Sequence, residues 1–107
     1  MQTQTHREKM NDPYTVIELH AIVSGQVQGV GFRAKVYAHA TRIGLTGSVC
    51  NLANGSVEIY AQGTKEQLTQ LLTLMQQDAG RGSVGSITTD YYAPTRTYTD
   101  FVILKNR

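Results

Sequence analysis

The first regular pattern in the chain is an alternation of apolar and polar residues over positions 17–24. Ile17, Leu19, Ala21 and Val23 alternate with more polar neighbours such as Glu18, which predicts a strand with one buried face. Residues 45–51 and 57–62 form shorter patterns of the same kind, and the intervening Asn54-Gly55 is a typical hairpin turn. Two further strands are expected near 84–91 and 99–104, the last with Phe101 and Ile103 pointing inward.

Two other segments show helical rather than alternating spacing. The first begins at Phe32 and reaches Gly44, a residue that often ends helices, and the second runs from Lys65 to about Ala79, before the sequence AGRG. Their apolar positions are Val36, Tyr37, Ala40 and Ile43 in the first, and Leu68, Leu71, Leu72 and Met75 in the second. The element order is therefore β-α-β-β-α-β with a short fifth strand at the C-terminus. This order predicts an α+β, ferredoxin-like fold, with both helices packed on one face of an antiparallel sheet.

Length, charge and cysteine content limit the number of domains, the class of partner and the compartment, but they do not identify the function. A chain of 107 residues suits one domain, which we expect over residues 14–107, after a polar N-terminal arm of residues 1–13. The formal net charge of +2 argues against a polyanion-binding surface. A single cysteine, Cys50, indicates a reducing compartment, and no apolar run resembles a membrane span or secretory signal. We expect a cytoplasmic monomer.

The loop between the first strand and the first helix carries the strongest chemical signal. It reads GQVQGVGFR, from Gly25 to Arg33. Its glycines allow a tight curl at a helix start, where backbone N–H groups and the helix dipole together favour an anion. Arg33 adds a planar cation able to hold two phosphate oxygens at once. Taken by itself, a Gly-x-x-Gly turn with an exposed arginine is more often structural, so the loop needs independent support.

That support is a resemblance to the acylphosphatase family. The loop is similar to the family signature G-x-V-Q-G-V-x-F-R, and a second family motif follows at the expected distance. The matching residues are Gly25, Val27, Gln28, Gly29, Val30, Phe32 and Arg33 in the first motif, and Gly47, Val49, Asn51, Gly55, Val57 and Gly63 in the second. The resemblance extends over roughly residues 16–104. Ser48 and Cys50 depart from the usual second motif at positions that are not catalytic in the family.

The resemblance implies an enzyme that hydrolyses the carboxyl-phosphate bond of acyl phosphates. It implies that backbone N–H groups of Gln28, Gly29, Val30, Gly31 and Phe32, together with Arg33, hold the phosphoryl group. It further implies that Asn51 orients the attacking water, without a metal, a cofactor or a covalent intermediate. An asparagine amide cannot act as a base at neutral pH, but it can fix a water in line with the scissile bond. The implied partner is a small-molecule acyl phosphate whose acyl group the sequence does not identify.

Other interpretations fit the residues less well. RNA-recognition domains share the element order, but the strand that would carry their stacking aromatics offers only Tyr60, so we expect no nucleic-acid binding. A binding domain without turnover is disfavoured because both Arg33 and Asn51 are present. Histidines 6, 20 and 39 are scattered, with His20 expected on the outer face of the sheet, so no metal site is predicted. Cys50 is expected to be a buried structural residue rather than a nucleophile.

Overall fold

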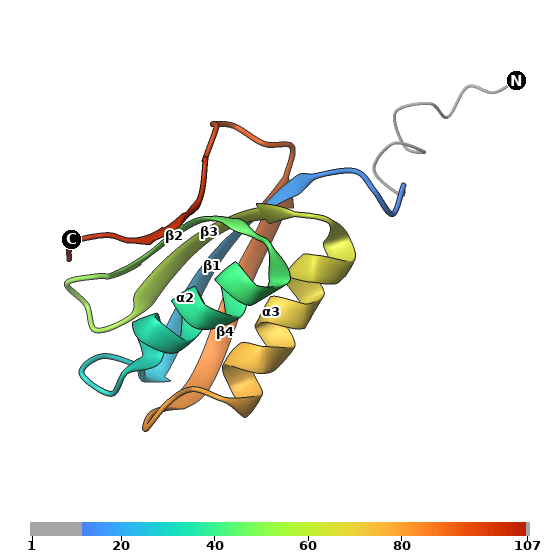
Figure 1. Ribbon diagram of the computed structural model, residues 1–107. Helices are drawn as coiled ribbons and strands as arrows, with labels where there is room; N and C mark the ends of the chain where they lie inside the picture. Colours follow the sequence, from blue (N-terminus) through green and yellow to red (C-terminus); the bar gives the residue numbers. More distant parts are fainter. Residues whose placement is uncertain (1–11, 107) are drawn as a thin grey trace, which may run out of the picture.

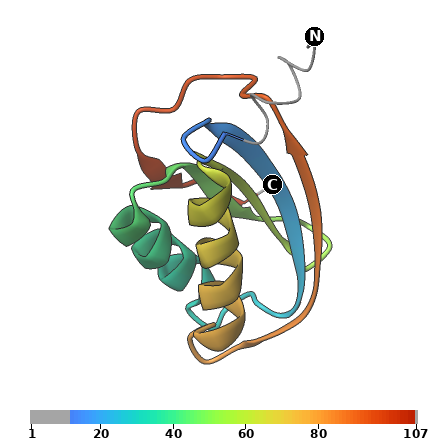
Figure 2. The same cartoon turned by 90° about the vertical axis from the view of Figure 1, so that its right-hand side faces the viewer.

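The computed structural model describes residues 12–106, and the predicted arm lies almost entirely outside them. The strands are β1 (Ile17–Gln26), β2 (Thr46–Asn51), β3 (Val57–Gly63), β4 (Ser83–Tyr92) and β5 (Phe101–Ile103), and the helices are α2 (Phe32–Ile43) and α3 (Lys65–Gln77). The sheet order is β4-β1-β3-β2-β5. Both helices cover one face of this sheet (Figures 1 and 2), as the ferredoxin-like prediction requires.

The pairing of the strands is mainly antiparallel, with one addition. β1 pairs antiparallel with β3 and with β4, and β2 pairs antiparallel with β3. The short β5 instead joins the free edge of β2 in parallel, so the complete sheet is mixed. This parallel pair becomes possible because residues 93–100 carry the chain across from β4, at the opposite edge, before β5 begins (Figure 1).

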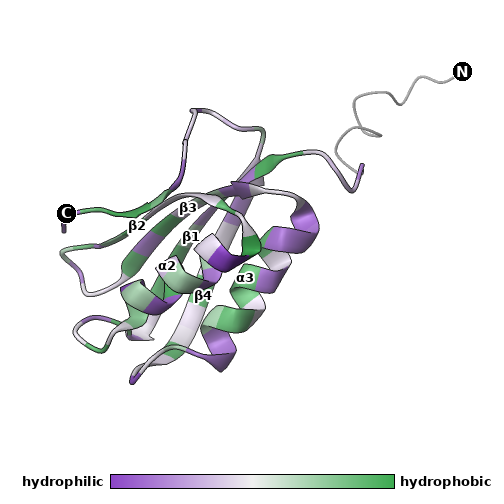
Figure 3. Ribbon diagram, in the orientation of Figure 1, coloured by the Kyte–Doolittle hydropathy of each residue, from purple (hydrophilic) through white to green (hydrophobic). Residues whose placement is uncertain are grey.

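The hydrophobic core lies between the helices and the sheet. Figure 3 shows hydrophobic and hydrophilic residues interspersed along both helices. On these helices, the side chains of Val36, Leu68 and Met75 are fully buried. The inward residues of β1 are likewise buried, as the alternation predicted. α3 begins with a capping box, in which the Thr64 hydroxyl accepts from the backbone N–H of Gln67 and the Gln67 side chain accepts from the backbone N–H of Thr64.

Four expectations from the pattern need correction. Tyr37 is 41% exposed and Ile103 is 45% exposed, so neither belongs to the core. α3 ends at Gln77 rather than near Ala79, and β5 covers only residues 101–103, so each predicted element was too long.

Among the helices of residues 12–106, none is long and apolar enough to cross a membrane.

Glu18 departs from the expected alternation in a more informative way. Its pattern position places it on the outer face of the sheet, yet its side chain is fully buried. Thr95, from the segment that follows β4, covers it, and its backbone N–H donates to Oε1 over 3.0 Å. The amide of Gln62, in the neighbouring β3, donates to the same oxygen over 2.9 Å. The outer face of β1 is therefore partly covered by residues more than seventy positions away, which no local pattern can reveal.

Candidate active site

The site is built where β1 ends and α2 begins. β1 ends at Gln26, residues 27–31 form a loop, and Gly31 is the N-terminal cap of α2 with φ 83° and ψ 10°. We call residues 27–31 the phosphate loop, after the role that the sequence predicts. Its apolar side chains fix it to the core: Val27 and the adjoining Phe32 are each 1% exposed, and Val30 packs against the same cluster.

The backbone of the phosphate loop is open on the side away from the core. The N–H groups of Gln28, Gly29, Val30 and Gly31 donate to no acceptor within residues 12–106. A Cβ atom placed on Gly29 or Gly31 would meet no other atom within 4 Å. Unpaired donors beside a helix N-terminus form a favourable environment for an anion.

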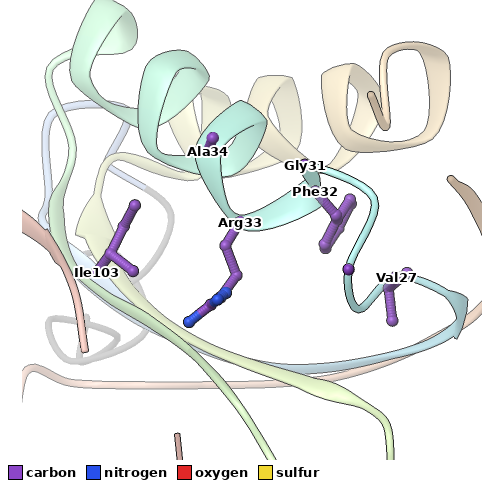
Figure 4. Close-up of a pocket in the computed structure, with 7 residues that line it drawn as sticks. Val27, Gly31, Phe32, Arg33, Ala34 and Ile103 are labelled. Atoms are coloured by element: carbon purple, nitrogen blue, oxygen red, sulfur yellow. The ribbon is translucent and has the colours of Figure 1, made fainter. Parts of the chain in front are cut away.

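Arg33 lies in the first turn of α2 and reaches into the pocket next to this loop. Figure 4 shows its guanidinium between Ile103 on one side and Phe32 and Val27 on the other. The pocket has a volume of about 200 Å³, and its lining residues are Val27, Gly29, Gly31, Phe32, Arg33, Ala34 and Ile103. The Arg33 Nη1 donates to Oδ1 of Asn106 over 3.2 Å, an exposed contact. A cation beside unpaired N–H groups makes this pocket suitable for a phosphoryl group.

Asn51 ends β2 at the same end of the sheet as the phosphate loop. It pairs with Val57 of β3, and Val57 pairs with Val23 near the end of β1, so the strands align these positions side by side. Asn51 is only 6% exposed, and its Oδ1 has no hydrogen-bond partner within the described part of the chain. A buried amide oxygen without a partner is costly, so it needs a donor such as a water molecule.

Two segments that the sequence did not mark as functional also contribute to the site. Ile103 and Asn106, from β5 and the residues after it, line the pocket and contact Arg33 respectively. The AGRG sequence, predicted only to stop a helix, lies against the phosphate loop, where the Arg81 N–H donates to the Val30 carbonyl over 3.0 Å. The glycines of AGRG were a detectable signal, whereas nothing local distinguishes Asn106.

His20, His39 and Cys50 do not line this pocket, and His6 lies outside the described residues. His20 lies on the outer face, as predicted, stacked on Tyr60 and with Nε2 2.8 Å from Oε2 of Glu58. His39 is buried between the helices, and Cys50 is buried in β2. Within residues 12–106, no cluster of three or more His, Cys, Asp or Glu side chains is arranged to hold a metal ion.

Two residues of α2, Lys35 and His39, lie close to the carboxylate of Asp78, with Nε2 of His39 3.5 Å from Oδ2. Lys35 Nζ lies 3.2 Å from Oδ2 of Asp78, and both side chains are roughly half exposed. The hydrogen bond from Lys35 holds the pKa of the Asp78 carboxyl below its ordinary value of 3.8. Asp78 is the C-terminal cap of α3 and directly precedes AGRG, so this pair lies close to the segment that contacts the phosphate loop. Neither Lys35 nor Asp78 lines the pocket.

Comparison with known proteins identifies the family of this chain. The acylphosphatase family model matches residues 19–103. An acylphosphatase of Dehalococcoides mccartyi is 44% identical over 86 residues, covering 79% of this chain and 94% of that protein. An acylphosphatase of Mycolicibacterium smegmatis is 42% identical, covering 78% of this chain and 85% of the relative.

The solved structures give the same result. The crystal structure of an acylphosphatase from Bacillus subtilis superposes with a TM-score of 0.79 at 31% identity, covering 82% of this chain and 98% of that one. The family match spans both the phosphate loop and the strand that ends at Asn51. Sequence, fold and element order thus lead to one conclusion: the chain belongs to the acylphosphatase family.

Proposed function

We propose that the chain hydrolyses acyl phosphates by in-line attack of a water that Asn51 orients on a phosphoryl group held by the phosphate loop, Phe32 and Arg33. The hydrolysis of acyl phosphates follows from membership of the family. The division of labour among the residues is our proposal. The observation that supports it most directly is the buried, unpaired Asn51 Oδ1 at the same sheet end as an open loop of unpaired N–H groups.

The phosphoryl group is bound first. The N–H groups of Gln28, Gly29, Val30, Gly31 and Phe32 donate to its non-bridging oxygens, and the Arg33 guanidinium adds charge-assisted hydrogen bonds. These donors are in position before substrate arrives, so they stabilise the charge that spreads over those oxygens in the transition state without having to reorganise. Ile103 and Ala34 give the pocket an apolar wall that an aromatic or aliphatic acyl group can contact.

Attack then needs only a correctly placed water. Asn51 Oδ1 accepts one hydrogen of the water, whose oxygen bonds to phosphorus as the bond from phosphorus to the acyl oxygen breaks. The carboxylate leaves with the electron pair and needs no proton, because a carboxylate is stable at neutral pH. A phosphoryl oxygen takes the proton released by the water, so the products are a carboxylate and inorganic phosphate. No step requires a metal, and we expect EDTA to leave the rate unchanged.

Two alanine variants separate binding from attack. Arg33→Ala removes charge-assisted bonds to phosphate, so the affinity for inorganic phosphate should fall roughly 10- to 150-fold, together with turnover. Asn51→Ala leaves the loop and Arg33 in place, so phosphate affinity should persist while kcat falls on the order of 100-fold. Isothermal titration with phosphate and hydrolysis of an aromatic acyl phosphate measure the two quantities.

Arg42→Ala is the matched control for the arginine variant, because Arg42 is exposed in the last turn of the same helix. It should change neither phosphate affinity nor turnover. Near-normal kcat in Asn51→Ala would refute the role of Asn51 in orienting the water. Unchanged phosphate affinity in Arg33→Ala would refute the role of Arg33 in binding.

A further inference from the structure

The side chain of Gln28 makes a connection that the proposed mechanism does not use. Its Nε2 donates to the carbonyl oxygen of Leu52 and to that of Ser56, each over 2.8 Å. Gln28 belongs to the phosphate loop, whereas Leu52 and Ser56 lie at the two ends of the turn between β2 and β3. A primary amide has two N–H hydrogens, and here each is directed at one carbonyl oxygen.

The turn does not need Gln28 in order to close. The Leu52 N–H already donates to the Ser56 carbonyl over 2.9 Å, and the Gly55 N–H donates to the Leu52 carbonyl over 3.1 Å. A carbonyl oxygen has two lone pairs, so Gln28 supplies a second bond to each oxygen rather than the first. What the side chain adds is therefore a connection between the turn and the phosphate loop.

The sheet itself does not provide this connection. β3 lies between β1 and β2, so the loop that follows β1 and the end of β2 share no ladder of hydrogen bonds. Across the described residues, no other hydrogen bond joins positions 27–31 to positions 51–56. Leu52 directly follows Asn51, so the two bonds from Gln28 fix the backbone next to the residue that orients the water.

We infer that Gln28 is a positioning residue whose side chain holds Asn51 at the correct distance from the phosphoryl group. The inference rests on the proposed function, because it gives Asn51 the role of orienting water. In-line attack is sensitive to placement, and an error of about 1 Å can cost on the order of 100-fold in rate. The backbone N–H of Gln28 serves phosphate binding in the proposed mechanism, and the side chain has this separate role.

Gln28→Met tests the inference because methionine has similar length but no donor. Phosphate binding depends on backbone groups and Arg33, so the dissociation constant for inorganic phosphate should change by less than about threefold. The kcat for an aromatic acyl phosphate should fall roughly tenfold or more. A purely structural role would not produce this separation of kcat from phosphate affinity. Gln70→Met, on the exposed surface of α3, is the matched control and should change neither quantity.

A double-mutant cycle gives the sharper result. In an Asn51→Ala background there is no amide left to position, so adding Gln28→Met should lower kcat by less than about twofold. Single-turnover measurements with enzyme in excess keep these slow variants measurable. An equal loss in both backgrounds, or unchanged kcat in Gln28→Met alone, would overturn the inference. If Gln28→Met does not fold, Gln28→Asn retains a polar amide but is too short to reach both carbonyls, and the same outcomes apply.

The experiment also separates this inference from the function on which it rests. A slow Asn51→Ala combined with a fully active Gln28→Met would refute the role of Gln28 alone. A fully active Asn51→Ala would refute the orientation of water by Asn51, and the inference about Gln28 with it.

Discussion

Two glycine-containing segments meet at one end of the sheet, and glycine is required in each for a different reason. In the phosphate loop, Gly29 and Gly31 have φ angles of 73° and 83°, and a Cβ on either would meet nothing within 4 Å. In the segment after α3, a Cβ on Gly82 would overlap the backbone oxygen of Gln26 and Cγ2 of Val30. The first segment needs glycine for its backbone conformation, and Gly82 is needed because there is no room for a side chain.

The difference indicates which side of the loop is open to a ligand. The open side, where added atoms would meet nothing, is the side available to a phosphoryl group. The crowded side lies against residues 80–82, which are held there by the bond from the Arg81 N–H to the Val30 carbonyl. A phosphate loop that must be complementary to its ligand before binding benefits from such rigid support.

The largest effect is expected from adding a methyl group on the crowded side. In Gly82→Ala, the backbone near Gln26 must move, because the closest overlap is with the main-chain oxygen of Gln26, which cannot swing away as the end of a flexible side chain could. Overpacking of this kind typically costs about 1–3 kcal/mol, so the free energy of unfolding should fall by that amount. The displaced loop should also lose affinity for inorganic phosphate. Urea unfolding and phosphate titration measure both.

Gly85→Ala provides the control for crowding. Gly85 lies three residues further along, in β4, where the nearest atom to an added Cβ would be the Ser24 carbonyl oxygen at 3.4 Å. This is an ordinary contact, so stability and phosphate affinity should stay close to those of the unchanged protein. Equal losses in the two variants would show that Gly82 has no special role in supporting the loop.

A smaller effect is expected on the open side, from Gly31→Ala. A residue with a Cβ pays about 1–2 kcal/mol in the left-handed region, and the chain can relieve this strain by shifting the loop. Phosphate affinity should therefore fall together with stability. The same two measurements apply, unfolding by urea and titration with phosphate.

Gly44→Ala is the matched control, since Gly44 caps the opposite end of α2 with φ 98°. It should lose a similar amount of stability but no phosphate affinity. If the two variants weakened phosphate binding equally, the effect of Gly31 would be a general loss of stability and not a change in the loop.

The sequence was sufficient for the parts of this molecule that depend on local patterns. Alternation along β1 and helical spacing in α3 predicted their inward residues, and the order of elements predicted the fold. The motif at 25–33 indicated the loop and the arginine that we propose for phosphate binding, and both border one pocket of the structure. The roles of Arg33 and Asn51 stay predictions until the variants are measured.

What the sequence could not provide are contacts between segments distant along the chain. Gln28 reaches Ser56, Gly82 faces Gln26, and Thr95 covers Glu18, and each pair depends on how the strands are ordered. Ile103 was predicted to point inward because its strand alternates, yet a three-residue strand at the sheet edge leaves it beside the pocket. Periodicity describes one element at a time, so it does not reveal which element covers another.

The smallest effect should come from removing the ion pair between Lys35 of α2 and Asp78. Asp78 lies just before residues 80–82, which support the phosphate loop. Because Lys35 lowers the pKa of Asp78 in the folded state, this pair stabilises the fold at pH above 3.8, and the stabilisation is lost as the pH falls through the lowered pKa. Asp78→Asn should thus lower stability slightly at neutral pH and make no further difference in strong acid. Urea midpoints for both proteins across this range measure the change. A constant difference at every pH would mean that Asp78 acts through packing rather than charge. A difference that is present above pH 3.8 and disappears in strong acid would mean that the charge of Asp78 stabilises the fold.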